Sequence, residues 1–141
     1  MTVYADSSFF VSTYIKDAHS NSAAASVSSG EPVWFTPLHL AEWTHAVAQH
    51  VFFEKMSDAE AEKVYSQMEQ DRSSGMWAET PIPERAFELC ADLARRHGPG
   101  IGVSTLDSLH VACALELKAD RFWTFDERQA KLAKAAGLKI S

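Results

Sequence analysis

Val3-Tyr4-Ala5-Asp6-Ser7-Ser8 is the stretch that decides the fold. Residues 2–5 form a short apolar strand, and Asp6-Ser7-Ser8 offers capping groups for a helix over residues 8–16. A strand that leads directly into a helix is typical of an α/β protein with a parallel sheet. In such sheets the ligand site lies beyond the carboxyl ends of the strands, which is where Asp6 stands.

The alternation of strands and helices continues along the chain. Residues 31–36 and 121–124 are further apolar strands, residues 138–140 are a possible last strand, and residues 77–82 fit either a strand or a loop. Ser57 and Glu60 form a capping box, and Ser104 with Asp107 resembles a second one. The remaining helices are expected over residues 20–29, 37–51, 57–72, 83–97, 104–118 and 126–137. This order predicts a parallel sheet covered on both faces, with right-handed crossovers.

Length and composition bound the class of protein. A chain of 141 residues fits one domain over residues 1–141, and 46% hydrophobic with 23% charged residues excludes a disordered or fibrous chain. The net charge of −6 argues against a protein that wraps nucleic acid along a whole face. Neither a signal peptide nor a membrane-length apolar run is present, so we expect a cytoplasmic protein. Cys90 and Cys113 lie in apolar helical patterns, which predicts buried thiols.

Four carboxylates fall near the predicted carboxyl edge of the sheet. Asp6 and Asp126 follow strands, while Glu42 and Asp107 lie early in helices. Two ionised carboxylates at ~4 Å repel by roughly 4 kcal/mol at an effective dielectric constant of ~20. A divalent cation relieves that repulsion, and an all-oxygen ligand set suits Mg²⁺ or Mn²⁺. Such a site suits phosphoryl chemistry.

Each acid also has a structural interpretation. Asp6 and Asp107 are equally well explained as helix caps, and Asp126 as a first-turn acid that faces the helix dipole. Glu42 is different because it lies in an apolar stretch, where an acid without a partner is costly. A functional role, rather than a structural one, is therefore favoured most strongly for Glu42.

Other site classes fit the sequence less well. His39, His45 and His50 surround Glu42 without an HExxH motif, and their spacing spreads them over more than one helix face, so solvated or core histidines are favoured over zinc ligands. Ser8 stands where a haloacid dehalogenase-like phosphatase needs its second aspartate. The acidic pair of a response-regulator receiver is not evident either.

Four segments resemble the PIN-domain nucleases. Residues 3–8 are similar to the opening motif of that family, Leu40-Ala41-Glu42-Trp43 to its acid-bearing helix, residues 106–114 to its Asp-x-leucine-x-x-alanine helix, and residues 122–128 to its final strand and acidic turn. Leu132-Ala133-x-x-Ala136-Gly137-Leu138 resembles the usual ending. The length is similar to that of VapC-type toxins of toxin–antitoxin pairs. At Gln129 the chain departs from relatives that carry a further acid, which leaves Asp126, with Glu127 as a substitute.

The resemblance implies a three-layer α/β/α PIN-like fold with a central, mainly parallel sheet of about four to five short strands. It also implies a ribonuclease dependent on Mg²⁺ (or Mn²⁺), which leaves a 5′-phosphate and a 3′-hydroxyl. Asp6, Glu42, Asp107 and Asp126 would be its catalytic residues and metal ligands. Residues expected to bind substrate are Ser8, Thr124, Arg128 and Lys131, although Arg128 and Lys131 equally fit a solvated helix face.

The same resemblance implies three partners: an RNA substrate, a small antitoxin and a second copy of the chain. Aromatic residues near the helices over residues 8–29 and 57–72 either line a groove for an antitoxin segment or belong to the core; they are Phe9, Phe10, Tyr14, Phe52 and Phe53. A PIN nuclease with a non-toxin role in RNA processing is an alternative, and so is a non-catalytic PIN-fold binding module. The complete set of four acids favours the enzyme over the module.

Overall fold

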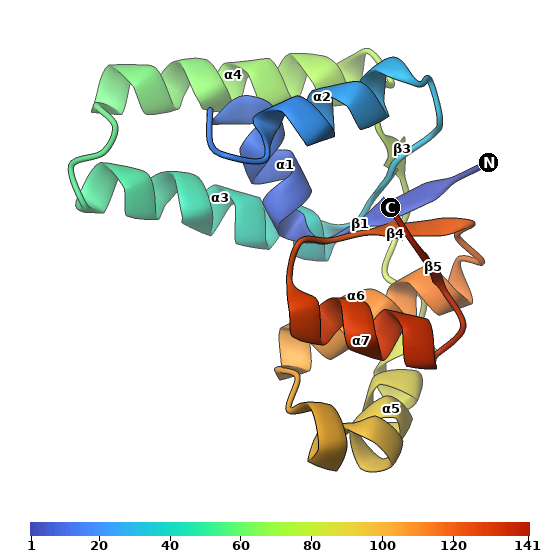
Figure 1. The fold of residues 1–141 in the computed structure, drawn as a ribbon. Coiled ribbons are helices and arrows are strands. Elements are labelled where there is room, and N and C mark those ends of the chain that lie inside the picture. Colours follow the sequence, from blue (N-terminus) through green and yellow to red (C-terminus); the bar gives the residue numbers. More distant parts are fainter. The chain divides into compact units, whose positions relative to one another are not determined.

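The structure is a computed structural model that describes residues 1–141, and the chain forms two compact units. Unit 1 consists of Met1–Asp6 and Pro81–Ser141, and unit 2 consists of Ser7–Thr80. Seven helices and five strands make up the two units, and Figure 1 labels them in chain order. No helix combines the length and apolar character needed to cross a membrane.

The sheet of unit 1 joins the two ends of the chain. Its strands are β1 (Val3–Ala5), β4 (Arg121–Trp123) and β5 (Lys139–Ile140), in the order β1-β4-β5, and both pairings are parallel. The ladder continues past β1, because the Asp6 N–H donates to the Trp123 carbonyl at 3.2 Å. Asp6 and Thr124 therefore emerge at the same edge of the sheet, as expected for parallel strands.

The start of β1 is held by a second long-range bond. The Thr2 N–H donates to Asp120 Oδ2 at 2.7 Å, just before β4 begins. This bond lowers the pKa of the Asp120 carboxyl, because it favours the ionised form. The register of β1 against β4 is thus fixed at both ends of the strand.

Three helices complete unit 1: α5 (Ala86–Ile101), α6 (Thr105–Glu116) and α7 (Glu127–Ala135). Seven consecutive residues of α6, 108–114, are buried, so this helix is covered on every side. Within this core, the Tyr4 hydroxyl is 2.8 Å from His110 Nδ1, and the Tyr4 ring stacks on Phe122. Gly137, with φ 98°, ends α7 in a conformation that favours glycine, as the sequence predicts.

Both cysteines are buried free thiols, which confirms that expectation. Burial raises the pKa of Cys90 and raises the pKa of Cys113 to about 11. A thiol with so high a pKa holds almost no thiolate at neutral pH, and is therefore a poor nucleophile.

The sequence-based limits of α5 are wrong at both ends. The helix begins at Ala86, after a turn in which the Ala86 N–H bonds to the Pro83 carbonyl at 2.9 Å. It also continues to Ile101 with Pro99 inside it, although an interior proline costs a helix about 3 kcal/mol. Gly102, with φ 73°, donates to the Gly98 carbonyl at 2.8 Å and closes the final turn, so the last turn is retained.

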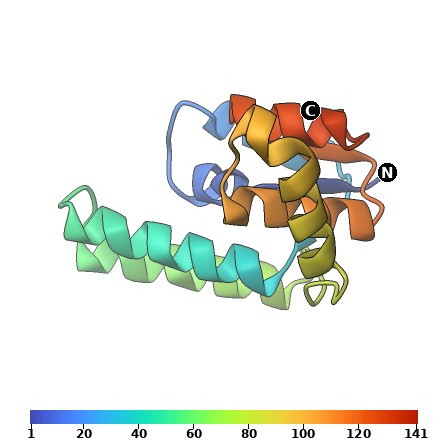
Figure 2. The ribbon, with the colours of Figure 1, turned by 90° about the horizontal axis from the view of Figure 1, so that it is seen from below.

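Unit 2 contains α1 (Ser7–Tyr14), α2 (Ser20–Ser28), β2 (Trp34–Phe35), α3 (Pro37–Phe52), α4 (Asp58–Ser73) and β3 (Ala78–Glu79). β2 and β3 form a separate parallel pair, so the ambiguous residues 77–82 contain a two-residue strand. All strand pairs are parallel and five strands are present, as expected, but they divide into two sheets. Figures 1 and 2 show α3 and α4 as an antiparallel pair.

Aromatic side chains form the core of unit 2. Phe9 and Phe10 are fully buried, and the Phe10 ring packs edge-on against Phe35 at 5.1 Å and Trp77 at 5.0 Å. Phe9 and Phe10 are therefore core residues. Phe52 and Phe53, by contrast, are 78% and 63% exposed at the end of α3.

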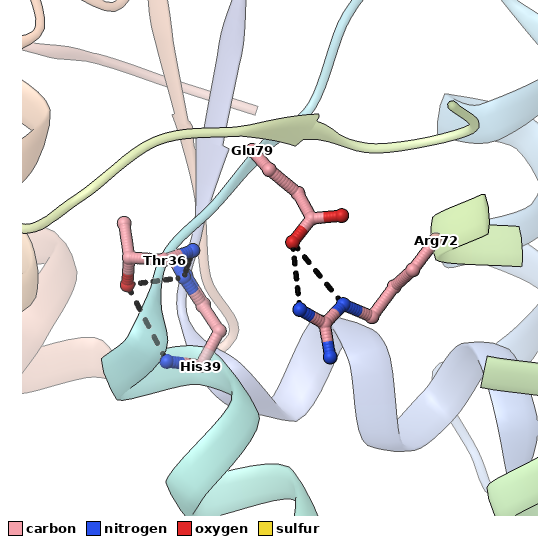
Figure 3. Close-up of polar contacts among 4 residues, drawn as sticks. All are labelled: Thr36, His39, Arg72 and Glu79. Carbon is pink, nitrogen blue, oxygen red and sulfur yellow. Dashed lines mark hydrogen bonds and ion pairs between the residues drawn. The ribbon is translucent and has the colours of Figure 1, made fainter. Parts of the chain in front are cut away.

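The start of α3 explains the buried histidine. The Thr36 N–H donates to His39 Nδ1 at 2.9 Å, and the His39 N–H donates back to Thr36 Oγ1 at 3.4 Å, so the two residues form a reciprocal cap (Figure 3). His39 is thus a core histidine, as the sequence favours. In the same unit, the Arg72 guanidinium binds Glu79 Oε1 at 2.9 Å and joins α4 to β3 (Figure 3).

Replacing Tyr14 by Phe should destabilise unit 2. The Tyr14 hydroxyl donates to Asp71 Oδ2 at 2.5 Å and accepts from the buried Trp77 Nε1–H at 3.0 Å, and burial followed by the Asp71 bond raises the pKa of the phenol. Tyr14→Phe leaves the indole N–H without its acceptor, so we expect a loss of about 1–3 kcal/mol in urea unfolding. Tyr65→Phe is the matched control, since the 3.5 Å contact of its hydroxyl with the Thr44 carbonyl is at the limit of a hydrogen bond. Equal losses in the two variants would contradict this assignment.

Candidate functional site

The Thr124 hydroxyl is the centre of a polar network at the carboxyl edge of the unit 1 sheet. Thr124 follows β4 and is only 5% exposed. Its Oγ1 lies 3.0 Å from Asp6 Oδ2 and 2.7 Å from Gln129 Oε1, and it accepts the Asp126 N–H at 3.0 Å. One hydroxyl group thus connects the residues that follow β1 and β4.

Asp126 performs two tasks. It is the N-cap of α7, where its Oδ1 accepts the Gln129 N–H at 2.8 Å. It is also exposed, so its carboxylate reaches solvent while it caps the helix. The structural interpretation of Asp126 as a helix-start acid therefore holds, and it leaves the carboxylate accessible for chemistry.

Asp107 joins the network through its backbone. The Ser104 side chain caps α6 by accepting the Asp107 N–H at 3.3 Å. The Asp107 carbonyl accepts Gln129 Nε2–H at 3.2 Å, which ties the first turn of α6 to the first turn of α7. The Asp107 residue is half-buried at this junction.

Glu42 belongs to unit 2, on α3. It is half-buried, and its Oε1 accepts the Ser7 hydroxyl at 2.7 Å, so the acid has the polar partner that its apolar surroundings require. Ser7 is the residue after Asp6 in the chain.

The predicted site residues differ in whether they belong to the polar network. Asp6, Asp107, Asp126 and Thr124 share the network of unit 1, whereas Ser8, Arg128 and Lys131 are exposed. Neither unit gathers three or more His, Cys, Asp or Glu side chains closely enough to hold a metal ion.

Gln129 is a residue of the network that the sequence shows only as the absence of an acid. It is fully buried and bonded to three parts of the network. Its position three and four residues before the buried Leu132 and Ala133 is the pattern that places it inside.

The donor set suits a hard cation. The side chains of Asp6 and Asp126 offer only oxygen atoms as ligands. Asp6 contacts the Thr124 hydroxyl through Oδ2, whereas Asp126 contacts it through its backbone N–H. Mg²⁺ keeps several waters and commonly binds only one or two protein carboxylates, so one or two aspartates at this edge fit its requirements. The arrangement is therefore suited to bringing a cation to a phosphate.

Comparison with known proteins gives a family match over most of the chain. The family model of the PIN domain matches residues 3–135. The chain belongs to the PIN domain family. That match runs through both compact units and includes all four candidate acids of the PIN domain. No curated protein sequence matches the chain.

Solved structures share this PIN fold at low sequence identity. FitAcB from Neisseria gonorrhoeae has a TM-score of 0.73 at 15% identity, covering 98% of this chain and 95% of that one. VapC20 from Mycobacterium tuberculosis, a sarcin–ricin loop cleaving toxin, has a TM-score of 0.68 at 17% identity, covering 96% and 95%. VapBC2 from Rickettsia felis, bound to a promoter DNA fragment, has a TM-score of 0.68 at 16% identity, covering 100% and 98%.

Replacing Thr124 by Val should weaken the fold of unit 1. Valine has a similar shape but no hydroxyl, so the Asp126 N–H and Gln129 Oε1 lose their partner inside the protein. We expect a loss of about 1–3 kcal/mol in urea unfolding measured in EDTA. Thr124→Ser retains the hydroxyl and is the matched control. If both variants lose the same stability, the methyl group rather than the network accounts for the effect.

Proposed function

We propose that this PIN domain chain is a metal-dependent ribonuclease and the toxin of a toxin–antitoxin pair. The observation that carries the proposal is the Thr124 network, which connects Asp6, Asp126 and the Asp107 backbone at one edge of a parallel sheet. Aspartates that follow the strands at such an edge suit a cation and a phosphate. The resemblance to VapC-type toxins, and a PIN-fold relative that cleaves the sarcin–ricin loop, favour RNA as the substrate.

In this proposal the four acids have different roles. Asp6 and Asp126, with Asp107, hold Mg²⁺ or Mn²⁺, and Glu42 binds it or orients the attacking water. Glu42 is included because the resemblance to PIN-domain nucleases assigns an acid of this helix to the site. When bound, the metal supplies Lewis acidity to the phosphate, a more acidic water and charge for the leaving oxygen.

The remaining groups handle the RNA. Arg128 and Lys131 are exposed on α7, which begins at the Asp126 cap, and we assign them to the phosphates that flank the scissile one. Ser8, exposed in the first turn of α1, contributes a hydroxyl to the backbone of the substrate. Thr124 is assigned to the site itself, where it holds Asp6. In-line attack would leave a 5′-phosphate and a 3′-hydroxyl.

A toxin of this kind requires an inhibitor, because uncontrolled cleavage of RNA would damage the cell that makes it. We therefore propose a small antitoxin and a homodimer of this chain, acting in the cytoplasm. The exposed Phe52–Phe53 pair supports a protein partner, since its rings lie 5.0 Å apart and largely in solvent. Phe9 and Phe10 do not take part, because both are buried in the core of unit 2.

Replacing Asp6 by Asn should abolish cleavage of single-stranded RNA. The substitution retains shape and removes a proposed metal ligand, so we expect the rate to fall by at least about 100-fold, beyond the roughly 10–100-fold cost of losing an outer-shell partner. EDTA should abolish the wild-type activity, and added Mn²⁺ or Mg²⁺ should restore it. The measurement is cleavage of an end-labelled oligoribonucleotide, with the product ends identified by phosphatase treatment.

Asp92→Asn is the control for that experiment. Asp92 is an exposed acid on α5 that pairs only with Arg96 on the same helix, so its loss should leave cleavage unchanged. Undiminished cleavage by Asp6→Asn, or by the wild type in EDTA, would contradict a metal-dependent nuclease. Binding of RNA without cleavage under any metal condition would favour the binding module instead.

Co-expression with the adjacent small reading frame should yield a complex without nuclease activity. We expect the neighbouring protein to co-purify with the full chain and to inhibit cleavage in proportion to its amount. The control is the same pair with Phe52→Ser and Phe53→Ser in the toxin, which should weaken co-purification while the free chain keeps its activity. If no neighbouring protein co-purifies with the chain or inhibits its cleavage of RNA, the toxin role is wrong and only the nuclease proposal remains.

A further inference from the structure

Gln129 is a buried polar residue near the start of α7, directly after two exposed residues. Glu127 and Arg128 before it are exposed, whereas Gln129 is 0% exposed. Leu132 and Ala133, three and four residues later, occupy the same inward stripe of α7 and are apolar. An apolar residue would therefore continue the stripe, while a buried amide is costly unless its groups are bonded.

The hydrogen bonds of Gln129 link the aspartate-bearing segments of unit 1. Its Nε2–H donates to the Asp107 carbonyl, its Oε1 meets the Thr124 hydroxyl at 2.7 Å, and its backbone N–H donates to the Asp126 carboxylate. Thr124 in turn contacts Asp6. One residue thereby ties α6, α7 and the ends of β1 and β4 together.

The orientation of the amide follows from this network. The Asp107 carbonyl accepts only, so Nε2 must face it, and Oε1 must then face Thr124. The Thr124 hydroxyl has a single proton, and both Gln129 Oε1 and Asp6 Oδ2 lie within hydrogen-bond distance of its oxygen. Gln129 therefore competes with Asp6 for that proton. When Gln129 receives it, Asp6 Oδ2 does not accept a hydrogen bond from Thr124.

We infer that Gln129 is a positioning residue of the metal site, which sets the relative placement of Asp6, Asp107 and Asp126 and provides the alternative acceptor for the Thr124 proton. The inference rests on the proposed nuclease function. It assigns to the amide the place where some relatives of this family carry a further acid. Removal of outer-shell partners of metal ligands commonly costs 10–100-fold in metal affinity or activity.

The test compares Gln129→Leu with the wild-type full chain. Leucine fills the volume and keeps the inward stripe apolar, but it removes both side-chain bonds. We expect Mn²⁺ affinity, measured by isothermal titration calorimetry, to fall about 10-fold or more. On an oligoribonucleotide, kcat should fall by a similar factor while KM changes less than threefold, because the substrate contacts remain. Gln129→Met, which is flexible and of similar length, is the second variant if Leu prevents folding.

Leu132→Val is the matched control for general loosening of α7. Leu132 is 1% exposed on the same inward stripe, one turn further on, and contributes no bond to the network. It should lower the melting temperature in EDTA and leave Mn²⁺ affinity within twofold of the wild type. The pair Thr124→Val and Gln129→Leu forms a double-mutant cycle in which the combined loss of Mn²⁺ affinity should be smaller than the sum of the two single losses, since both variants remove the bond between Thr124 and Gln129.

The outcomes separate this inference from the proposed function. If Gln129→Leu and Leu132→Val have the same Mn²⁺ affinity, or if the losses in the cycle are additive, Gln129 is a structural tie only and the inference is wrong. If the wild type binds Mn²⁺ but cleaves no RNA, the nuclease proposal fails, while the Mn²⁺ affinities still decide the role of Gln129. If the wild type binds no Mn²⁺, both are overturned.

Discussion

The parallel pairing of β1 with β4 is the constraint on which the candidate site depends. Parallel strands end at the same edge of a sheet. The residues that follow β1 and β4 therefore lie close together because of the strand pairing alone. Asp6 and Thr124 are those residues, and the bond between them is a direct consequence of the register Ala5↔Trp123. A shift of one residue would turn Thr124 to the opposite face of the sheet and would remove its hydroxyl from Asp6.

Strong local signals made much of this arrangement predictable. The capping box at Ser57, the N-cap at Ser104 and the glycine at 137 each have a fixed stereochemical meaning, and the helices that they bound lie where expected. The limits of α5 were not predictable from local rules, because Pro99 and two glycines argue for a break while Gly102 supplies a closing turn further on. The division of the strands into two sheets depends on long-range pairing that no local pattern contains.

The site shows the same limit more sharply. A carboxylate in an apolar stretch is conspicuous in a sequence, because burying a charge is costly. The strand and helix pattern therefore predicts the four acids as site residues. A glutamine carries no charge, and in a polar helix start it looks like a solvated residue. Only the coordinates show that Gln129 is buried and that its amide spans the first turns of two helices. The sequence predicts Thr124 as a residue that binds substrate, but it does not predict that the network converges on the Thr124 hydroxyl.

The divided make-up of unit 1 affects the order in which the protein is completed on the ribosome. Unit 2 is one continuous stretch, residues 7–80, whereas β1 must wait for β4, more than a hundred residues later, before it has a partner. At translation speeds of about 5–20 residues per second, β1 remains unpaired for several seconds, and closing so long a loop carries a large entropic cost. Asp6 meets the Thr124 hydroxyl, to which Gln129 also binds, only after β4 has been synthesised. The network at the carboxyl edge of the unit 1 sheet therefore forms only after the residues of unit 2 have been synthesised.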